Sequence, residues 1–139
     1  MSDPKVKLER KAKQLIKNET IIWLTTVDAD HTPQPRPVWF ILDKDAFLIF
    51  SDPKAHKVKH IKQNSSVSLH FNTDNSGNEN VIVYIGMATL ESDSPPAHKV
   101  RAYLRKYRKG IADLKMTPEE FGGAYSTAIR VKPTSLRGW

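Results

Sequence analysis

The chain has 139 residues, of which 39% are hydrophobic and 27% charged. These values are typical of one folded globular domain, here taken as residues 1–139, and not of a disordered chain. The sequence has no run of about 18 apolar residues and no secretory signal, so we expect a cytoplasmic protein without a membrane partner. Cysteine is absent, which excludes disulfides, thiolate catalysis and Cys-based metal sites.

The formal net charge is +7, and a basic chain favours an anionic partner. A phosphorylated small molecule, a nucleic acid and a membrane surface all have this chemistry. The position of the basic residues along the chain therefore matters for function.

The first third of the chain predicts one helix followed by strands. Apolar residues at helical spacing predict a helix over 3–18, and the β-branched and aromatic residues of 20–27 predict a strand. Prolines interrupt the segment that begins at residue 33, which predicts an irregular or edge strand. The apolar runs 38–42 and 46–50, on either side of a polar turn, predict a hairpin. These two runs hold more apolar residues than one barrel face needs, so we expect part of them to face a partner chain.

A second helix is predicted directly after the hairpin. Asp52 is a suitable N-cap and Pro53 suits the first helical position. Residues 67–71 then alternate between apolar and polar, as a strand with one wet face does. A polar loop follows over residues 72–80.

The last part of the chain combines strands with two more helices. We predict a long strand over 81–90, in which Gly86 marks a bulge or a close approach. Ser94 and Pro95 are predicted to cap a helix that runs to about Lys109.

Thr117 and Glu120 form a capping box for a shorter helix, and residues 128–131 predict a last strand. Consecutive strands joined mostly by short turns favour a mainly β fold of about six antiparallel strands, an antiparallel barrel with peripheral helices.

The segment 51–57 is the strongest candidate for chemistry. A strand ends, a helix begins, and the helix N-terminus offers free N–H groups and a positive dipole end to an anion. Ser51 can supply a hydroxyl, Lys54 or Lys57 a full positive charge, and His56 a further donor. The alternative is a solvated helix that is rich in lysine for solubility.

The chain resembles the pyridoxamine 5'-phosphate oxidase-like flavin split-barrel superfamily. The matching stretches are Pro35-Arg36-Pro37-Val38-Trp39-Phe40, Leu48-Ile49-Phe50-Ser51, Lys54-Ala55-His56-Lys57 and residues 61–71. The first helix, the strand 20–27 and the ending Arg137-Gly138-Trp139 also fit. Within the superfamily, the chain looks most like the short members that use FMN or the deazaflavin F420.

This resemblance implies a split β-barrel homodimer with two cofactor sites at the dimer interface. It also implies that Arg36, Ser51 and Lys57 hold the cofactor phosphate, while the backbone of residues 38–40 lies along the isoalloxazine ring. Trp139 either packs on the barrel or covers the partner's site, and the second role is favoured. The candidate cofactor-binding residues are Arg36, Pro37, Val38, Trp39, Ser51, Lys54, His56, Lys57 and Trp139.

Two departures argue against the vitamin B6 reaction of the true oxidases. Those enzymes carry a C-terminal arginine-rich segment for the substrate phosphate, of which only Arg137 remains here, and Ile41 stands near the place of their second-strand lysine. The sequence therefore predicts an FMN- or F420-dependent oxidoreductase that acts on a small-molecule substrate. No residue stands out as a catalytic acid or base, and no pattern indicates a metal site.

Three alternatives stay open at this point. The first is a protein of the same fold that binds or stores a flavin without catalysis. The second is a nucleic-acid-binding module that uses the basic run 98–109, with Tyr103 and Tyr107 among its cations. A solvated helix face is the favoured interpretation of that run, because the same tyrosine spacing suits a buried stripe. A haem-handling relative of the split barrel is the third and most remote.

Overall fold

In the computed structural model, which describes residues 3–139, seven strands form one antiparallel sheet in the order β2-β1-β5-β6-β7-β4-β3. The strands are β1 (Ile22–Val27), β2 (Pro33–Val38), β3 (Ile41–Asp43), β4 (Ala46–Ser51), β5 (Ser66–His70), β6 (Ile82–Glu91) and β7 (Thr127–Gly138). The helices are α1 (Pro4–Asn18), α2 (His56–Gln63), the short 3-10 turn η1 (Ala97–Lys99), α3 (Arg101–Asp113) and α4 (Pro118–Ala124).

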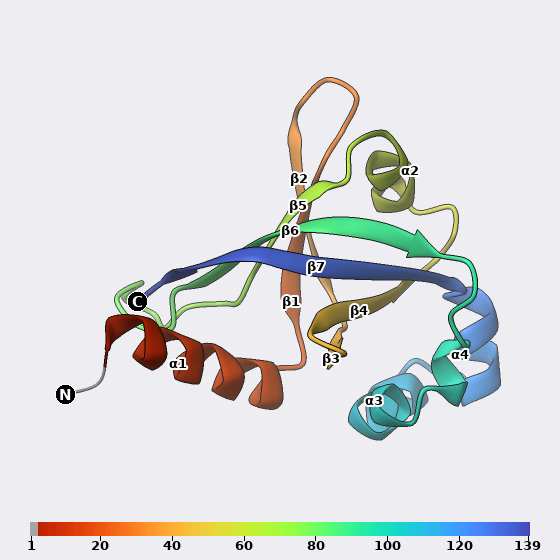
Figure 1. Cartoon of the computed structure of the whole chain (residues 1–139). Coiled ribbons are helices and arrows are strands. Elements are labelled where there is room, and N and C mark those ends of the chain that lie inside the picture. Colours follow the sequence, from red (N-terminus) through yellow and green to blue (C-terminus); the bar gives the residue numbers. More distant parts are fainter. Residues whose placement is uncertain (1–2) are drawn as a thin grey trace.

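The sheet curls into a split β-barrel with peripheral helices, as the sequence predicted (Figure 1). In this view α1 lies below one end of the long strand β7, and α3 and α4 lie below its other end. Helix α2 lies on the opposite side of the sheet. None of the helices within residues 3–139 is long and apolar enough to cross a membrane.

Strand β4 is buried on both of its faces, which explains its uninterrupted apolar sequence. Phe47 and Ile49 point into the barrel core. Leu48 and Phe50 belong to a second core cluster, which β4 shares with α3 and α4. The expectation that surplus apolar residues of this run face a partner chain was wrong for β4, because α3 and α4 of the same chain cover them.

The apolar run 38–42 is divided between two strands, so the sheet has seven strands where about six were predicted. The division lies at Phe40, whose backbone is bound by a side chain from α3. The Phe40 N–H donates to the Tyr107 hydroxyl at 2.8 Å. That hydroxyl lies 2.9 Å from the Phe40 carbonyl and 2.8 Å from the Thr20 carbonyl, to either of which it can donate. The phenol thus replaces a strand partner at this point of the chain.

Lys106, the neighbour of Tyr107, adds a second contact to the same peptide. Its Nζ donates to the Phe40 carbonyl at 3.1 Å and lies 3.7 Å from the centroid of the Phe40 ring. Burial lowers the pKa of Lys106 to about 8 and raises the pKa of Tyr107 above its ordinary value. Helix α3 is therefore attached to the barrel through polar groups in a mostly apolar setting.

Trp39, the residue before Phe40, packs closely against α3. The Trp39 ring stacks with Tyr107 at a centroid distance of 4.6 Å and with Phe121 of α4 at 5.5 Å. A Cβ added at Gly110 would lie 2.9 Å from Cη2 of Trp39. The glycine inside α3 is thus explained by packing, although glycine weakens a helix by about 1 kcal/mol relative to alanine.

Two elements in the last part of the chain have bounds that differ clearly from the sequence predictions. The helix expected to begin at Ser94 and Pro95 begins at Arg101, after a 3-10 turn, and extends to Asp113. The last strand, predicted over residues 128–131, continues to Gly138, because its second half pairs with β6. The bulge or close approach expected at Gly86 is confirmed, because the pairing with β7 shifts register between Ile85 and Gly86 and a Cβ added at Gly86 would lie 2.7 Å from the Lys132 carbonyl oxygen.

Replacing Tyr107 with Phe should destabilise the fold by about 1–3 kcal/mol, because the buried Phe40 N–H loses its acceptor. Denaturant unfolding would measure the change. Tyr84→Phe is the control, since the Tyr84 hydroxyl makes no hydrogen bond within residues 3–139. Equal stability losses in the two variants would contradict a special role for the Tyr107 hydroxyl.

Gly110→Ala should also destabilise the protein, by about 1–3 kcal/mol, because the new methyl group meets the Trp39 ring. Gly123→Ala is the matched control on α4, where an added Cβ meets nothing within 4 Å. That control should leave stability unchanged or raise it by up to about 1 kcal/mol. Denaturant unfolding measures both variants. Unchanged stability of the Gly110 variant would show that the contact with Trp39 does not require a glycine at this position.

Candidate functional site

A cleft of about 370 Å³ opens where the end of β2, the end of β4 and the α3–α4 pair meet. Its volume is in the range of small-molecule sites. One end of the cleft is polar and is formed by Ser51, Asp52 and Lys57. The rest is mostly apolar and aromatic, lined by Ile21, Pro37, Val38, Trp39, Phe50, Tyr103, Leu114, Phe121 and Tyr125.

A turn between β4 and α2 shapes the polar end. The Asp52 carboxylate accepts the Lys54 N–H at 2.8 Å, and the Asp52 carbonyl accepts the Ala55 N–H at 3.0 Å. Helix α2 therefore begins at His56 after an N-cap at Ala55, and the prediction that Asp52 caps the helix with Pro53 in its first turn was wrong. Aspartate side chains are suited to such turns as well as to helix caps, because they can bind the backbone N–H two residues ahead.

Ser51 and Lys57 are brought together across this turn. The Lys57 Nζ donates to Ser51 Oγ at 3.4 Å, and Ser51 Oγ donates to the Asp52 carbonyl at 3.0 Å. Ser51 is 2% exposed, and Lys57 is half-buried. A hydroxyl and an ammonium group thus lie side by side at the polar end of the cleft.

The charge of Lys57 is held in an unfavourable setting. Burial lowers the pKa of Lys57, and the nearby positive charge of Arg36 lowers it further. The Asp52 carboxylate acts in the opposite direction and is the smallest of the three influences. Arg36 is exposed on β2, and its guanidinium donates to the Pro35 carbonyl at 2.7 Å. An anion between these two cations would remove their repulsion.

The other predicted site residues divide into two groups. Pro37, Val38 and Trp39 line the cleft. Phe40, the last residue of the segment 38–40 that was expected along the ring, does not line it, because its N–H and carbonyl are bound by side chains of α3. The Trp39 ring is packed against Tyr107 and Phe121. A ligand in the cleft could therefore contact the backbone of Trp39 and the edge of its ring. Lys54 lies in the turn and His56 is the first residue of α2, and both side chains are exposed. Neither residue lines the cleft.

Trp139 lies elsewhere in the same chain. Its backbone pairs with Val81 beyond the last pair of β6 and β7, whereas the cleft is at the other end of β7, where Ser51 pairs with Thr127. Its side chain is 65% exposed and borders a small pocket next to α1. A role for Trp139 at the cleft of a second chain stays a prediction.

Sequence reasoning missed the lining residues from α3 and α4. Tyr103, Phe121 and Tyr125 line the cleft together with Leu114, which follows α3. The stripe of Tyr103 and Tyr107 was visible in the sequence, and the structure shows both rings buried. Nothing in their spacing indicates which strand ends they would face.

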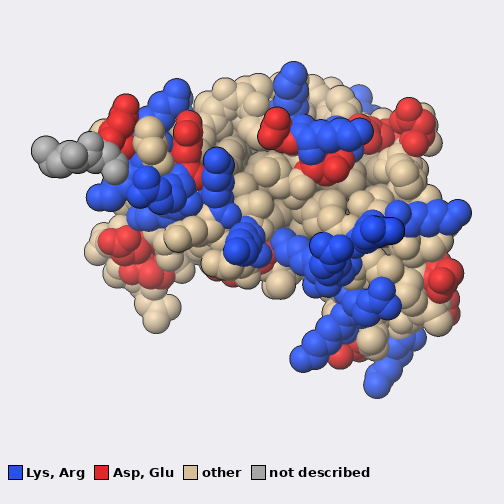
Figure 2. Space-filling view, turned by 60° about the horizontal axis from the view of Figure 1, so that its bottom comes forward, with Lys and Arg blue, Asp and Glu red and all other residues tan. Residues whose placement is uncertain are grey.

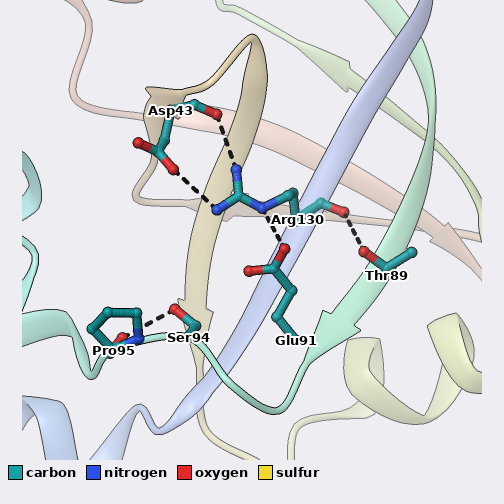
Figure 3. Close-up of polar contacts among 6 residues, drawn as sticks. All are labelled: Asp43, Thr89, Glu91, Ser94, Pro95 and Arg130. Carbon is teal, nitrogen blue, oxygen red and sulfur yellow. Dashed lines mark hydrogen bonds and ion pairs between the residues drawn. The ribbon is translucent and has the colours of Figure 1, made fainter.

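A larger hollow, of about 670 Å³, lies around Arg130 near the start of β4. Figure 3 shows the guanidinium between two acidic residues: it donates to the carboxylate of Glu91 and to the carboxylate and carbonyl of Asp43. Its charge is already balanced by these neighbours, whose hydrogen bonds also raise the pKa of Arg130. This cluster ties β3, β6 and β7 together, and Arg130 therefore has less to offer an anionic ligand than Lys57 has.

Comparisons with known proteins agree with the fold of the chain. The model of the family described as pyridoxamine 5'-phosphate oxidase matches residues 8–139. The pyridoxine/pyridoxamine 5'-phosphate oxidase of Vibrio vulnificus (strain YJ016) is 35% identical over 65 residues, which are 46% of this chain and 31% of that enzyme. The chain thus aligns with about a third of the length of its curated relatives.

Two solved structures show the same fold at low sequence identity. One, described as an F420 reductase, has a TM-score of 0.65 and 22% identity over 90% of this chain and 94% of that one. The other, the haem storage protein HutZ from Vibrio cholerae, has a TM-score of 0.66 and 16% identity over 94% and 93% of the two chains. Since the family model covers nearly the whole sequence, the chain belongs to the pyridoxamine 5'-phosphate oxidase family.

Proposed function

We propose that this protein binds FMN or F420 in the cleft between β2, β4 and the α3–α4 pair, and that it acts as an oxidoreductase on a small-molecule substrate. The observation that carries the proposal is the half-buried Lys57 beside Ser51 and near Arg36, at one end of an aromatic cleft. Both cofactors combine a phosphate with a flat heteroaromatic ring, which matches the two ends of this cleft.

The phosphate would be held at the polar end. Lys57 supplies a full charge, Ser51 a hydroxyl and Arg36 a second cation on the neighbouring strand. A phosphate dianion is a strong hydrogen-bond acceptor, and charge-assisted contacts of this kind contribute about 1.5–3 kcal/mol each. Binding would also raise the pKa of Lys57 back toward its ordinary value, because an anion favours the ammonium form.

The ring would lie in the apolar part, along the backbone of residues 37–39. Aromatic side chains of α3 and α4, together with Tyr125 after α4, also line this part of the cleft. The bound cofactor supplies the hydride chemistry, while the protein binds it, orients it and shields it from solvent. A flavin-binding protein without catalysis uses the same contacts, and turnover of a substrate with reduced cofactor distinguishes the two.

We further propose a homodimer in which a second chain completes each site. The outward face of β6 exposes Ile85 and Met87, at 41% and 43%, on alternate positions of the long strand. Such an apolar strip is suited to another protein surface. Trp139, exposed at the end of β7, is the residue we expect to reach the cleft of the partner chain.

The choice between FMN and F420 depends on the anionic lactyl-oligoglutamate tail of F420. Fluorescence titration with each cofactor at low and high salt tests it, since salt screens contacts between exposed charges. A protein that uses F420 should bind it more tightly at low salt and lose that advantage at high salt. If neither cofactor binds at either salt concentration, the proposal is wrong.

Lys57→Ala should weaken FMN and F420 binding by about 10- to 150-fold, the equivalent of about 1.5–3 kcal/mol. Lys59→Ala is the matched control, because Lys59 is exposed on the same helix and is not among the residues that line the cleft. The measurement is a fluorescence titration of each variant. Wild-type affinity in the Lys57 variant would remove Lys57 from the phosphate site.

Light scattering at micromolar concentration should give a mass near twice the 15.8 kDa of the single chain. Ile85→Lys with Met87→Lys should shift the protein toward the monomer, because two charges would have to be buried in the contact. Asn75→Lys with Asn78→Lys is the control, because it adds the same charge at exposed positions of the loop between β5 and β6. A wild-type monomer that still binds cofactor would contradict a shared site.

A further inference from the structure

The positive charge of the chain is concentrated on two helices. Helix α1 carries six Lys or Arg residues and one Glu, and α3 carries five and one Asp. Together they hold a formal charge of +9, while the whole chain has +7, so the remaining residues have a formal charge of −2. The cations are Lys5, Lys7, Arg10, Lys11, Lys13 and Lys17 on α1, and Arg101, Arg105, Lys106, Arg108 and Lys109 on α3.

Both helices lie on the same side of the sheet (Figure 1). Figure 2 looks at the molecule from this side and shows Lys and Arg side chains spread across it from the α1 end to the α3 end. Within residues 3–139, these two helices make a single ion pair, which joins Lys11 to Glu79. We call the exposed cations of α1 and α3 the basic face.

We propose that the basic face binds the phosphate backbone of double-stranded nucleic acid without reading its sequence. At 1.5 Å per residue, the helices are about 22 and 20 Å long. B-DNA carries one charge per about 1.7 Å of its axis when both strands are counted. A stretch of duplex as long as α1 or α3 therefore carries about a dozen phosphates. Contacts to phosphate alone give affinity without sequence information.

The buried side chains of α3 argue against a binding mode in which bases stack on this helix. Single-stranded nucleic acids are bound by stacking bases on exposed aromatic rings. Tyr103 and Tyr107, the aromatic residues of α3, are 0% and 3% exposed. The mode of binding first considered for the run 98–109, in which these tyrosines stack on bases, is therefore wrong.

A lipid surface is disfavoured because the apolar sides of both helices are already used. Ala12 and Leu15 of α1 are buried in the barrel core, and Ile111 of α3 is buried in the second cluster. Val6 is the one large apolar side chain that α1 and α3 expose within residues 3–139. Helices that lie in a membrane interface need a broad apolar face to insert.

The test is fluorescence anisotropy with labelled 20-base-pair DNA and RNA duplexes, the matching single strands, and vesicles of anionic lipid as competitors. The full-length protein should bind the duplexes in the micromolar range at about 50 mM salt. The logarithm of its affinity should fall linearly with the logarithm of the salt concentration. No binding to duplex at low salt, a preference for single strands, or displacement by vesicles at equal phosphate concentration would overturn the proposal.

Two variants and one control assign the surface. The α3 variant changes Arg101, Arg105, Arg108 and Lys109 to Gln, and the α1 variant changes Lys5, Lys7, Lys13 and Lys17 to Gln. Each should lower duplex affinity by about tenfold or more and reduce the salt slope by about 2 to 4. The control changes Lys44, Lys59, Lys62 and Lys132 to Gln, which removes the same charge from exposed positions elsewhere.

The control should keep its salt slope and lose less than about threefold in affinity. Circular dichroism establishes that each variant is folded. If the control weakens binding as much as the helix variants, net charge rather than the basic face is responsible, and the assignment is wrong. Because none of the altered residues is a proposed cofactor contact, failure of this test leaves the flavin site untouched.

Discussion

The hydroxyl of Tyr107 satisfies the backbone at the break between β2 and β3. Between β2 and β3 the Phe40 N–H has no strand partner and is buried, and a buried donor without an acceptor is costly. Because the acceptor comes from α3, the same bond that completes the sheet also fixes the helix against it. Trp39, Gly110 and Phe121 then pack around this connection.

The position of α3 in turn gives the cleft part of its lining. One part of the lining comes from the ends of β2 and β4, and another consists of aromatic residues from α3, from α4 and from the position that follows α4. The two cores meet across β4, whose alternate residues point into each of them. Ser51, the last residue of that strand, is thereby held beside Lys57 at the polar end of the cleft. The ligand chemistry we propose depends on this placement.

Local patterns were sufficient to predict most of the strands and the first helix. Alternation, apolar runs and turn residues are properties of neighbouring residues, and they located the hairpin of β3 and β4 and the bulge at Gly86. The prediction failed where a distant residue decides the conformation. The separation of β2 from β3 depends on Tyr107, 67 residues further along the chain, and the second half of β7 is a strand because β6 lies beside it.

The candidate site shows the same limit. Ser51, Lys57 and residues 37–39 could be found from the sequence because they lie in short stretches that resemble the family, and the cleft contains them. The start of α2 was misplaced because Asp52 binds the turn rather than the helix end. Tyr103, Phe121 and Tyr125 could not be assigned to the cleft, since helical spacing shows which side of a helix is apolar but not what it faces.

The account rests on an anionic, aromatic ligand in this cleft. The most direct measurement is a crystal structure of the protein with FMN or F420 bound. We expect the phosphate within hydrogen-bonding distance of Lys57 Nζ and Ser51 Oγ, and the ring along the backbone of residues 37–39. A cofactor bound with its phosphate away from Lys57 and Ser51, or crystals grown at saturating cofactor with the cleft filled only by solvent, would contradict the account.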